Sequence, residues 1–222
     1  MSASDGPGGR QAPEAVTGVI LAGGLGRRMG TVDKGLQIFR ERPMIASVLE
    51  RLRPQVDAIL INANQNRERY EEFGFPVVPD ELGGYAGPLA GLHAALGRAV
   101  TALVLTVPCD SPMLPLDLAA RLRAGMARAG ADLAVARTFS QSHPVFALVR
   151  TGVREHLDRF LAGGGRKIDA WYADLAIVEV AFDDEAEAFA NINTLRELAD
   201  FDAAPPEGGR AKPLAEEPGR RS

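Results

Sequence analysis

The sequence predicts an α/β protein with a doubly wound, mostly parallel sheet and helices on both faces. Three observations support this fold class. Short runs that are apolar throughout recur along the chain, as expected for strands buried on both faces. Segments with a helical pattern alternate with these runs and would supply the crossovers that parallel strands need. Unusual loops follow several of the runs, at the positions where such sheets bind ligands.

The first part of the chain alternates between the two kinds of segment. Apolar runs predict strands at residues 16–21, 58–61, 77–78, 102–107 and 133–136. Helical patterns predict helices at 43–52, 67–73, 88–99 and 116–129. After these come a strand at 144–149, a helix at 153–161, a short helix at 168–173, a strand at 175–180 and a closing helix at 194–201.

The length of 222 residues favours one domain, because a single hydrophobic core serves chains of up to roughly 250 residues. We expect this domain to span residues 15–202. Residues 1–14 and 203–222 are rich in glycine, proline and charged residues, and have too few apolar residues to pack. Both segments are therefore predicted to be disordered tails.

Composition excludes several classes of protein. A formal net charge of -4 argues against general nucleic-acid binding, which needs a basic surface. Cys109 is the only cysteine, which excludes an internal disulfide and a cysteine-based zinc site and favours a reducing compartment. No stretch approaches the roughly 18 apolar residues of a membrane span, and residues 1–14 lack the apolar core of a signal peptide. We expect a soluble, cytoplasmic protein.

A glycine-rich basic loop follows the first predicted strand. It reads LAGGLGRRMG from Leu21, and DKG follows at 33–35. Glycines let the backbone N–H groups approach a phosphate, while Arg27, Arg28 and Lys34 add the positive charge that a triphosphate needs. The spacing matches neither the dinucleotide-binding fingerprint nor a Walker A loop. The glycines alone would be more typical of a turn with solvated arginines, but Lys34-Gly35 and the two arginines indicate an anion site.

Asp110 ends the apolar strand predicted at 102–107. A hard cation such as Mg²⁺ takes oxygen ligands, often only one or two carboxylates together with substrate phosphates and water. We expect this strand to lie beside the first strand, which would place Asp110 opposite the glycine loop. Asp110 is therefore our candidate Mg²⁺ ligand. The alternative is a helix cap or turn residue before Ser111 and Pro112.

The pattern LAGGxGRRMG, followed after three residues by Lys-Gly, resembles the signature of nucleotidyltransferases that activate sugars, alditols and cofactors. With its Asp33-Lys34-Gly35 form and later motifs, the chain is most similar to the molybdenum cofactor guanylyltransferases, over about residues 17–202. The resemblance implies a Rossmann-like fold of the nucleotide-diphospho-sugar transferase type. It also implies that GMP passes from GTP to molybdenum-molybdopterin, with release of pyrophosphate.

The resemblance assigns nucleotide-binding roles to residues that follow the first four strands. It implies that the glycine loop wraps the nucleotide, that Lys34 reaches its phosphates and that Asp110 holds Mg²⁺. Arg28 is expected to be a second phosphate contact, and Asn62 and Asp80 to belong to the GTP site, although these two residues alone indicate only turns. The expected nucleotide-binding residues are Leu21, Ala22, Gly23, Gly24, Lys34, Asn62, Asp80 and Asp110, and Lys34, Arg28 and Asp110 are the expected catalytic residues.

Acceptor-binding residues are expected later in the chain. Candidates are Gly87, Gly91, His143, Arg166, Lys167 and Asn193. Each has a simpler alternative: the glycines as turn and cap, His143 as a backbone partner, the basic pair as solvated charges, and Asn193 as a helix N-cap.

Two other kinds of function stay open from the sequence. A sister enzyme would use the same chemistry to transfer CMP to molybdopterin, or to activate a sugar phosphate or phospholactate. A nucleotide-binding adaptor without catalysis is disfavoured because Lys34 and Asp110 are both present. Transient contact with molybdenum-insertion proteins or molybdoenzyme chaperones is a further hypothesis that the sequence does not decide.

Overall fold

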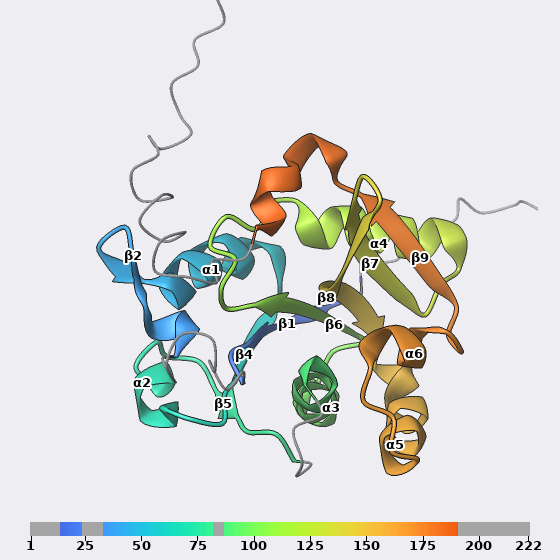
Figure 1. The fold of residues 1–222 in the computed structure, drawn as a ribbon, viewed down its shortest axis with the longest axis horizontal. Helices are drawn as coiled ribbons and strands as arrows, with labels where there is room; N and C mark the ends of the chain where they lie inside the picture. The colour runs from blue at the N-terminus through green and yellow to red at the C-terminus, as the bar shows by residue number, and fades with distance from the viewer. Residues whose placement is uncertain (1–13, 24–32, 82–86, 191–222) are drawn as a thin grey trace, which may run out of the picture.

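A computed structural model describes residues 14–23, 33–81 and 87–190 (Figure 1). Its main sheet has seven strands in the order β5-β4-β1-β6-β8-β7-β9. The strands are β1 (Val16–Leu21), β4 (Ala58–Asn62), β5 (Val77–Val78), β6 (Leu103–Pro108), β7 (Leu133–Thr138), β8 (Gln141–Arg150) and β9 (Ile177–Ala181). β8 runs antiparallel to β6 and β7, and the other pairings are parallel. The predicted doubly wound, mostly parallel sheet is confirmed.

Helices cover both faces of this sheet (Figure 1). One face carries α1 (Met44–Leu52) and α4 (Leu118–Ala129), and the other carries α3 (Pro88–Arg98), α5 (Arg154–Ala162) and α6 (Ile168–Tyr172). The short helix α2 (Arg67–Glu71) lies near β5 at the edge of the sheet. The described residues also include the 3₁₀ segments η2 (Lys34–Leu36), η3 (Arg53–Gln55), η4 (Thr151–Val153) and η5 (Asp183–Phe189). None of the described helices is long and apolar enough to cross a membrane.

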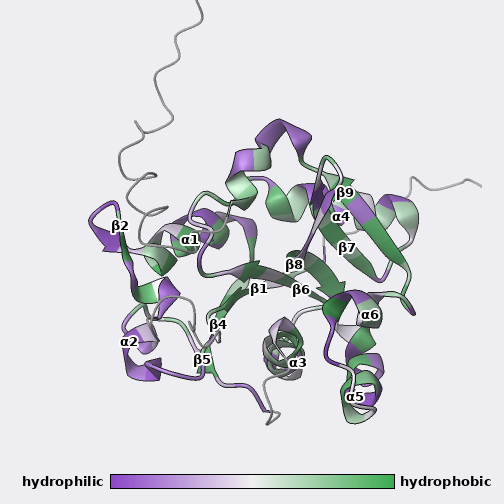
Figure 2. Ribbon diagram, in the orientation of Figure 1, coloured by the Kyte–Doolittle hydropathy of each residue, from purple (hydrophilic) through white to green (hydrophobic). Residues whose placement is uncertain are grey.

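The sheet separates two hydrophobic cores, and Figure 2 shows its strands as the most continuous apolar part of the ribbon. Successive residues of a strand point to opposite faces, so β6 contributes side chains to both hydrophobic cores. Leu103 and Leu105 belong to the core under α1 and α4, whereas Val104 belongs to the core under α3 and α5. Burial on both sides explains why these strands are apolar throughout.

The change in winding direction lies between β1 and β6. From β1 the chain moves to β4 and β5 on one side, and α3 then carries it back to β6 on the other side of β1. Ligands in such sheets bind beyond the carboxyl ends of the strands at this point. Leu21 and Pro108 are paired there at the ends of β1 and β6. The expected neighbouring position of the two strands is confirmed.

Several predicted boundaries shift. The helix expected from 116 begins at Leu118, because Asp117 has a non-helical backbone and takes the N-cap position. The strand expected from 175 begins at Ile177, because the Leu175 amide still bonds to the Tyr172 carbonyl in the turn that ends α6. β7 and β8 extend to a two-residue turn and meet in one hairpin.

A second, two-stranded sheet was not predicted. It pairs β2 (Ile38–Phe39) with β3 (Arg42–Pro43) just before α1. Strands of two residues are too short to show an alternating pattern. The closing helix predicted at 194–201 and both predicted tails lie outside the described residues, apart from the described Glu14, so they stay predictions.

Candidate active site

Lys34 and Asp110 meet at the carboxyl ends of the central strands. The Lys34 Nζ atom lies 2.9 Å from Asp110 Oδ2 and donates a hydrogen bond to it. Asp110 follows β6 by two residues, and Lys34 is the first residue of η2. The Asp110 side chain is only 11% exposed, so its charge needs a nearby cation to offset lost hydration. The sequence predicted this convergence.

The segment that carries Lys34 is fixed by α2 and its N-cap. Tyr70 is fully buried and its hydroxyl donates a hydrogen bond to Asp33, while Asn66 Nδ2 donates to the other Asp33 oxygen at 3.0 Å. Burial raises the pKa of Tyr70, and the negative charge of Asp33 adds to this effect. Tyr70 therefore stays a neutral donor to Asp33. Sequence analysis did not identify Tyr70 or Asn66, because their roles depend on tertiary contacts.

Gly35 is required by close packing behind Lys34. A Cβ atom at this position would lie 2.6 Å from the Tyr70 hydroxyl oxygen and 3.2 Å from the Cys109 Cβ. Such distances exclude a larger side chain without movement of the neighbours. Burial, followed by the negative charge of Asp110, raises the pKa of the Cys109 thiol. The thiol is therefore protonated at neutral pH and poorly suited to act as a nucleophile.

A second polar network lies at the ends of β4 and β5. The buried Asn62 side chain donates to Asp80 Oδ1 at 2.9 Å and to the Val78 carbonyl at 3.2 Å. Asn64 Nδ2 donates to Asp80 Oδ2 at 2.8 Å, and the Asp80 amide donates to Asn64 Oδ1 at 2.8 Å. The structure thus brings Asn62 and Asp80 together, as the sequence predicted. Asn64 also belongs to this network, although the sequence analysis did not propose it. Its position two residues after Asn62 could have indicated this role.

Two glycines, one just after β1 and one in α3, lie close to the Asn62 side chain. A Cβ atom at Gly23 would lie 3.1 Å from Asn62 Oδ1, and one at Gly91 would lie 2.4 Å from the same oxygen and 2.7 Å from Leu21 Cδ2. The start of α3 and the end of β1 therefore pack closely around Asn62. The Ala22 amide donates to the Asn62 carbonyl at 2.8 Å and continues this contact along the backbone.

Gly87 is needed for a different reason. It is the N-cap of α3 and has φ 61 and ψ -145, a conformation that side chains disfavour. No atom of the described part of the chain lies within 4 Å of a Cβ atom built there. The conformation and not the packing therefore explains this glycine. Gly24, Arg28 and Asn193 lie outside the described residues.

The remaining acceptor-side candidates bond to structural neighbours. His143 Nε2 and the Thr138 hydroxyl share a hydrogen bond of 2.7 Å, and the His143 ring stacks on Phe189 at 4.8 Å between centroids. Burial lowers the pKa of His143. Arg166 donates to the Leu161 carbonyl at 3.0 Å near the end of α5, and Lys167 is the N-cap of α6. None of these contacts reaches the Lys34–Asp110 pair.

The described residues offer few oxygen donors for Mg²⁺. Within residues 14–23, 33–81 and 87–190, no three or more histidine, cysteine, aspartate and glutamate side chains are grouped to hold a metal ion. Asp110 offers one carboxylate that already has an ammonium group 2.9 Å away. Mg²⁺ commonly uses one or two carboxylates and fills its other positions with phosphate oxygens and water. The residues fit a metal that arrives with a nucleotide and not a preformed cage.

The model of the MobA-like NTP transferase domain matches residues 18–176, which include the Lys34–Asp110 pair and the Asn62–Asp80 network. The chain belongs to the MobA-like NTP transferase family. Members of this nucleotidyltransferase family are enzymes, and the resemblance to the family that the sequence showed is confirmed.

Curated relatives of this family cover most of the chain. The molybdenum cofactor guanylyltransferase of Ralstonia nicotianae is 53% identical over 192 residues, which cover 82% of this chain and 94% of the relative. The enzyme of the same name from Shewanella putrefaciens is 49% identical over 189 residues, covering 85% and 97%.

Solved structures share the fold. The molybdopterin-guanine dinucleotide biosynthesis protein A of Archaeoglobus fulgidus has a TM-score of 0.69 at 23% identity, covering 84% of this chain and 96% of its own. A 4-diphosphocytidyl-2C-methyl-D-erythritol synthase from Anaerococcus prevotii has a TM-score of 0.68 at 11% identity, covering 86% and 96%. At such identities these likenesses show the fold alone, which is the Rossmann-like nucleotidyltransferase fold expected from the sequence.

Proposed function

We propose that this protein transfers GMP from GTP to molybdenum-molybdopterin, releasing pyrophosphate and forming the guanine dinucleotide form of the molybdenum cofactor. The observation that carries the proposal is the Lys34–Asp110 pair at the switch between β1 and β6. Relatives of about 50% identity, named molybdenum cofactor guanylyltransferase, support the choice of substrates. GTP turnover with and without molybdenum-loaded molybdopterin tests it, because pyrophosphate should appear only with the acceptor.

The proposed reaction is an in-line displacement at the α-phosphorus of GTP. An oxygen of the acceptor phosphate forms the new P–O bond, and the bond from the α-phosphorus to the bridging oxygen of pyrophosphate breaks. The bonding electrons leave with pyrophosphate. Positioning and neutralisation of charge dominate such reactions, so an enzyme nucleophile is not needed. The protonated Cys109 thiol is consistent with this mechanism.

Lys34 supplies positive charge in this mechanism. Its side chain is a quarter exposed and its ammonium group lies beside a carboxylate, so it can exchange that partner for a phosphate without crossing the core. Arg28, which lies outside the described residues, is proposed as a second cation for the leaving pyrophosphate. Backbone N–H groups of the loop that begins at Ala22 would position the phosphates.

Asp110 is proposed to hold Mg²⁺ when the nucleotide is bound. The ion would neutralise negative charge on the phosphate oxygens. Lys34 would then have its ammonium group available to the phosphates. The contact between Lys34 and Asp110 compensates both charges in the structure.

Asp80 is the proposed reader of the base. Guanine presents an N1–H and an amino group on its pairing edge, and a carboxylate can accept hydrogen bonds from both. Each Asp80 oxygen already accepts one bond from Asn62 or Asn64 and has a further lone pair available. Cytosine presents only one amino donor there, so this arrangement favours GTP.

Two alternatives have distinct outcomes in the same assay. A cytidylyltransferase of the same cofactor would release pyrophosphate from labelled CTP in preference to GTP, and an enzyme for a sugar phosphate or phospholactate would require that acceptor. An adaptor without catalysis would bind a nucleotide and release no pyrophosphate with any acceptor. The intact Lys34–Asp110 pair argues against an adaptor.

The proposed substrates also imply a location and partners. We propose that the protein acts in the cytoplasm, where cell fractionation should place it. Transient contact with molybdenum-insertion proteins or molybdoenzyme chaperones is a further proposal that cross-linking in cells would test.

A further inference from the structure

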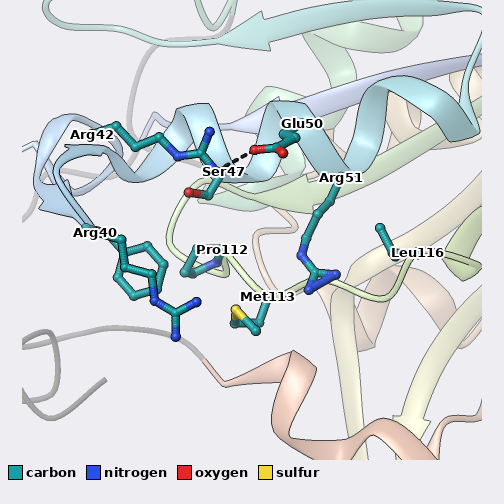
Figure 3. A pocket seen from close by; sticks show the side chains of 9 residues that line it. Arg40, Arg42, Ser47, Glu50, Arg51, Pro112, Met113 and Leu116 are labelled. Carbon is teal, nitrogen blue, oxygen red and sulfur yellow. Dashed lines mark hydrogen bonds and ion pairs between the residues drawn. The ribbon is translucent and has the colours of Figure 1, made fainter. Parts of the chain in front are cut away.

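An arginine-rich pocket lies between the β2–β3 hairpin, α1 and the loop after β6 (Figure 3). Its volume is about 440 Å³. The lining residues are Phe39, Arg40, Arg42, Ser47, Glu50, Arg51, Pro112, Met113 and Leu116. Three arginines and one glutamate make the pocket basic, although the whole chain has a formal net charge of -4.

The three arginines of the pocket interact with different partners. Arg42 forms an ion pair with Glu50. Arg51 donates one hydrogen bond of 3.3 Å to the Leu114 carbonyl, and a guanidinium group has five N–H donors. Arg40 stacks on Phe39, with its guanidinium carbon 5.1 Å from the ring centre. Figure 3 shows the Arg40 and Arg51 guanidinium groups on either side of Met113, and the Arg42–Glu50 pair at another part of the rim.

The turn that carries Arg40 has a costly backbone conformation. Arg40 and Glu41 have φ values of 47 and 66, and they connect the paired residues Phe39 and Arg42. Two-residue hairpin turns of this kind favour Asn-Gly, because side chains disfavour positive φ at both positions. Strain of this type persists only where the surrounding structure holds it, and it is concentrated at active sites and ligand-binding sites. Here it presents Arg40 beside the aromatic wall of the pocket.

The pocket borders the candidate active site. Pro112 lines it and follows Asp110 by only two residues, so their Cα atoms are at most about 7 Å apart. The β2–β3 hairpin, which forms one wall of the pocket, likewise begins soon after Lys34, since a single residue separates η2 from β2. A small molecule in the pocket would therefore lie next to the phosphates of a bound nucleotide.

We propose that this pocket binds a phosphorylated small molecule through Arg40 and Arg51. Guanidinium groups match phosphate oxygens in charge and in the geometry of two parallel hydrogen bonds. A volume of 440 Å³ falls in the range of sites for organic ligands, so Phe39, Met113 and Leu116 would pack against the body of the molecule. The phosphoryl group has two available sources: the acceptor substrate or the pyrophosphate that the reaction releases.

The test measures pyrophosphate binding by calorimetry without Mg²⁺. The starting protein carries Lys34→Met and Asp110→Asn together, which weakens the catalytic phosphate site without leaving either charge buried alone. Into this protein we introduce Arg51→Met or the pair Arg40→Asn and Glu41→Gly. Arg53→Met is the matched control, because Arg53 is an exposed arginine outside the pocket and two residues from Arg51.

We expect each pocket variant to weaken pyrophosphate binding by about 10- to 100-fold, as for the loss of a charge-assisted hydrogen bond, and Arg53→Met to leave it unchanged. The Arg40→Asn, Glu41→Gly pair should also raise Tm by about 2–4 °C, because Asn-Gly relaxes the turn. Binding and stability would then move in opposite directions, which general damage to the fold would not produce. Pyrophosphate binding that is undetectable in the starting protein, or equal in the Arg51 and Arg53 variants, would overturn the proposal.

A second measurement distinguishes the two sources, and only this arm rests on the proposed function. In the protein with native Lys34 and Asp110, Arg51→Met should raise KM for molybdopterin if the acceptor is the ligand. If pyrophosphate is the ligand, the same change should leave that KM unaltered and reduce inhibition by added pyrophosphate. No change in either quantity would contradict an oxyanion site in this pocket.

Discussion

Lys34 Nζ lies 2.9 Å from Asp110 Oδ2, although 76 positions of sequence separate the two residues. The parallel pairing of β1 with β6 creates this contact, because it places the loops that follow both strands at one edge of the sheet. Removing either side chain alone would leave the charge of the other poorly compensated in a mostly buried position. Activity measurements on single variants of the pair therefore need a measurement of stability beside them.

Replacing the carboxylate should abolish catalysis while the protein stays folded. We expect Asp110→Ala to reduce pyrophosphate release from GTP and the acceptor by at least about 100-fold, because the proposed Mg²⁺ ligand is lost. Circular dichroism and thermal unfolding would establish that the variant is folded. Undiminished GMP transfer by a folded Asp110→Ala protein would refute the metal assignment.

Base selectivity should depend on Asp80. We expect Asp80→Asn to lower kcat/KM for GTP by about 10- to 100-fold, because an amide cannot accept both guanine hydrogen bonds. The kcat/KM for CTP should change much less, so the quantity to measure is the ratio of kcat/KM for GTP to kcat/KM for CTP. Asn64→Ala is the comparison variant, since it removes a partner of Asp80 and keeps the carboxylate. An equal loss with both nucleotides would assign Asp80 a purely structural role.

Two glycines of α3 should respond differently to the same substitution. Gly91→Ala should destabilise the protein by about 1–3 kcal/mol and weaken nucleotide binding, because its Cβ would lie 2.4 Å from Asn62 Oδ1. Gly97→Ala meets only the end of the flexible Arg154 side chain at 3.0 Å, so the higher helix propensity of alanine should offset the contact. Denaturant unfolding of both variants checks this. Similar losses at both positions would show that the Asn62 contact is not the cause.

His143 should make stability depend on pH. Burial lowers the pKa of His143 in the folded protein, so the unfolded chain binds more protons as the pH falls below the usual histidine value of about 6.5. The stabilising contribution is present above that pH and is lost as the pH falls through the folded pKa. Urea unfolding at pH 7.5 and pH 5.5 should show a smaller difference for His143→Gln than for the native protein. An identical difference would mean that other groups cause the dependence.

The parts of the fold that follow from local pattern were predictable. Strands such as β6 are apolar throughout because both faces are buried, and this alone indicated a parallel sheet. The position of Asp110 opposite the loop after β1 followed from the same argument. Contacts made only in the tertiary structure were not predictable: nothing near Tyr70 in the sequence marks it as a partner of Asp33.

Short and strained elements also escaped prediction. The β2–β3 hairpin has two residues per strand, and its turn lacks the Asn-Gly pair that would indicate it. The arginines of the pocket are spread over two elements and resemble solvated surface residues until the hairpin folds against α1. His143 bonds to the Thr138 side chain and Arg166 to the Leu161 carbonyl, whereas the simpler alternatives were a backbone partner for His143 and a solvated charge for Arg166.

The sheet also implies an order of assembly. β7 and β8 are joined by a two-residue turn, so their hairpin closes a short loop, whereas the pairing of Val16 with Leu103 must bring together residues that are 87 positions apart in the sequence. Long loops close at a greater entropic cost and later in folding. Pulse-labelled hydrogen exchange should therefore protect amides of β8 before those of β1. The proposed GTP site at the carboxyl ends of β1 and β6 would then form only when folding is nearly complete. Binding of GTP during refolding would therefore indicate that folding has finished.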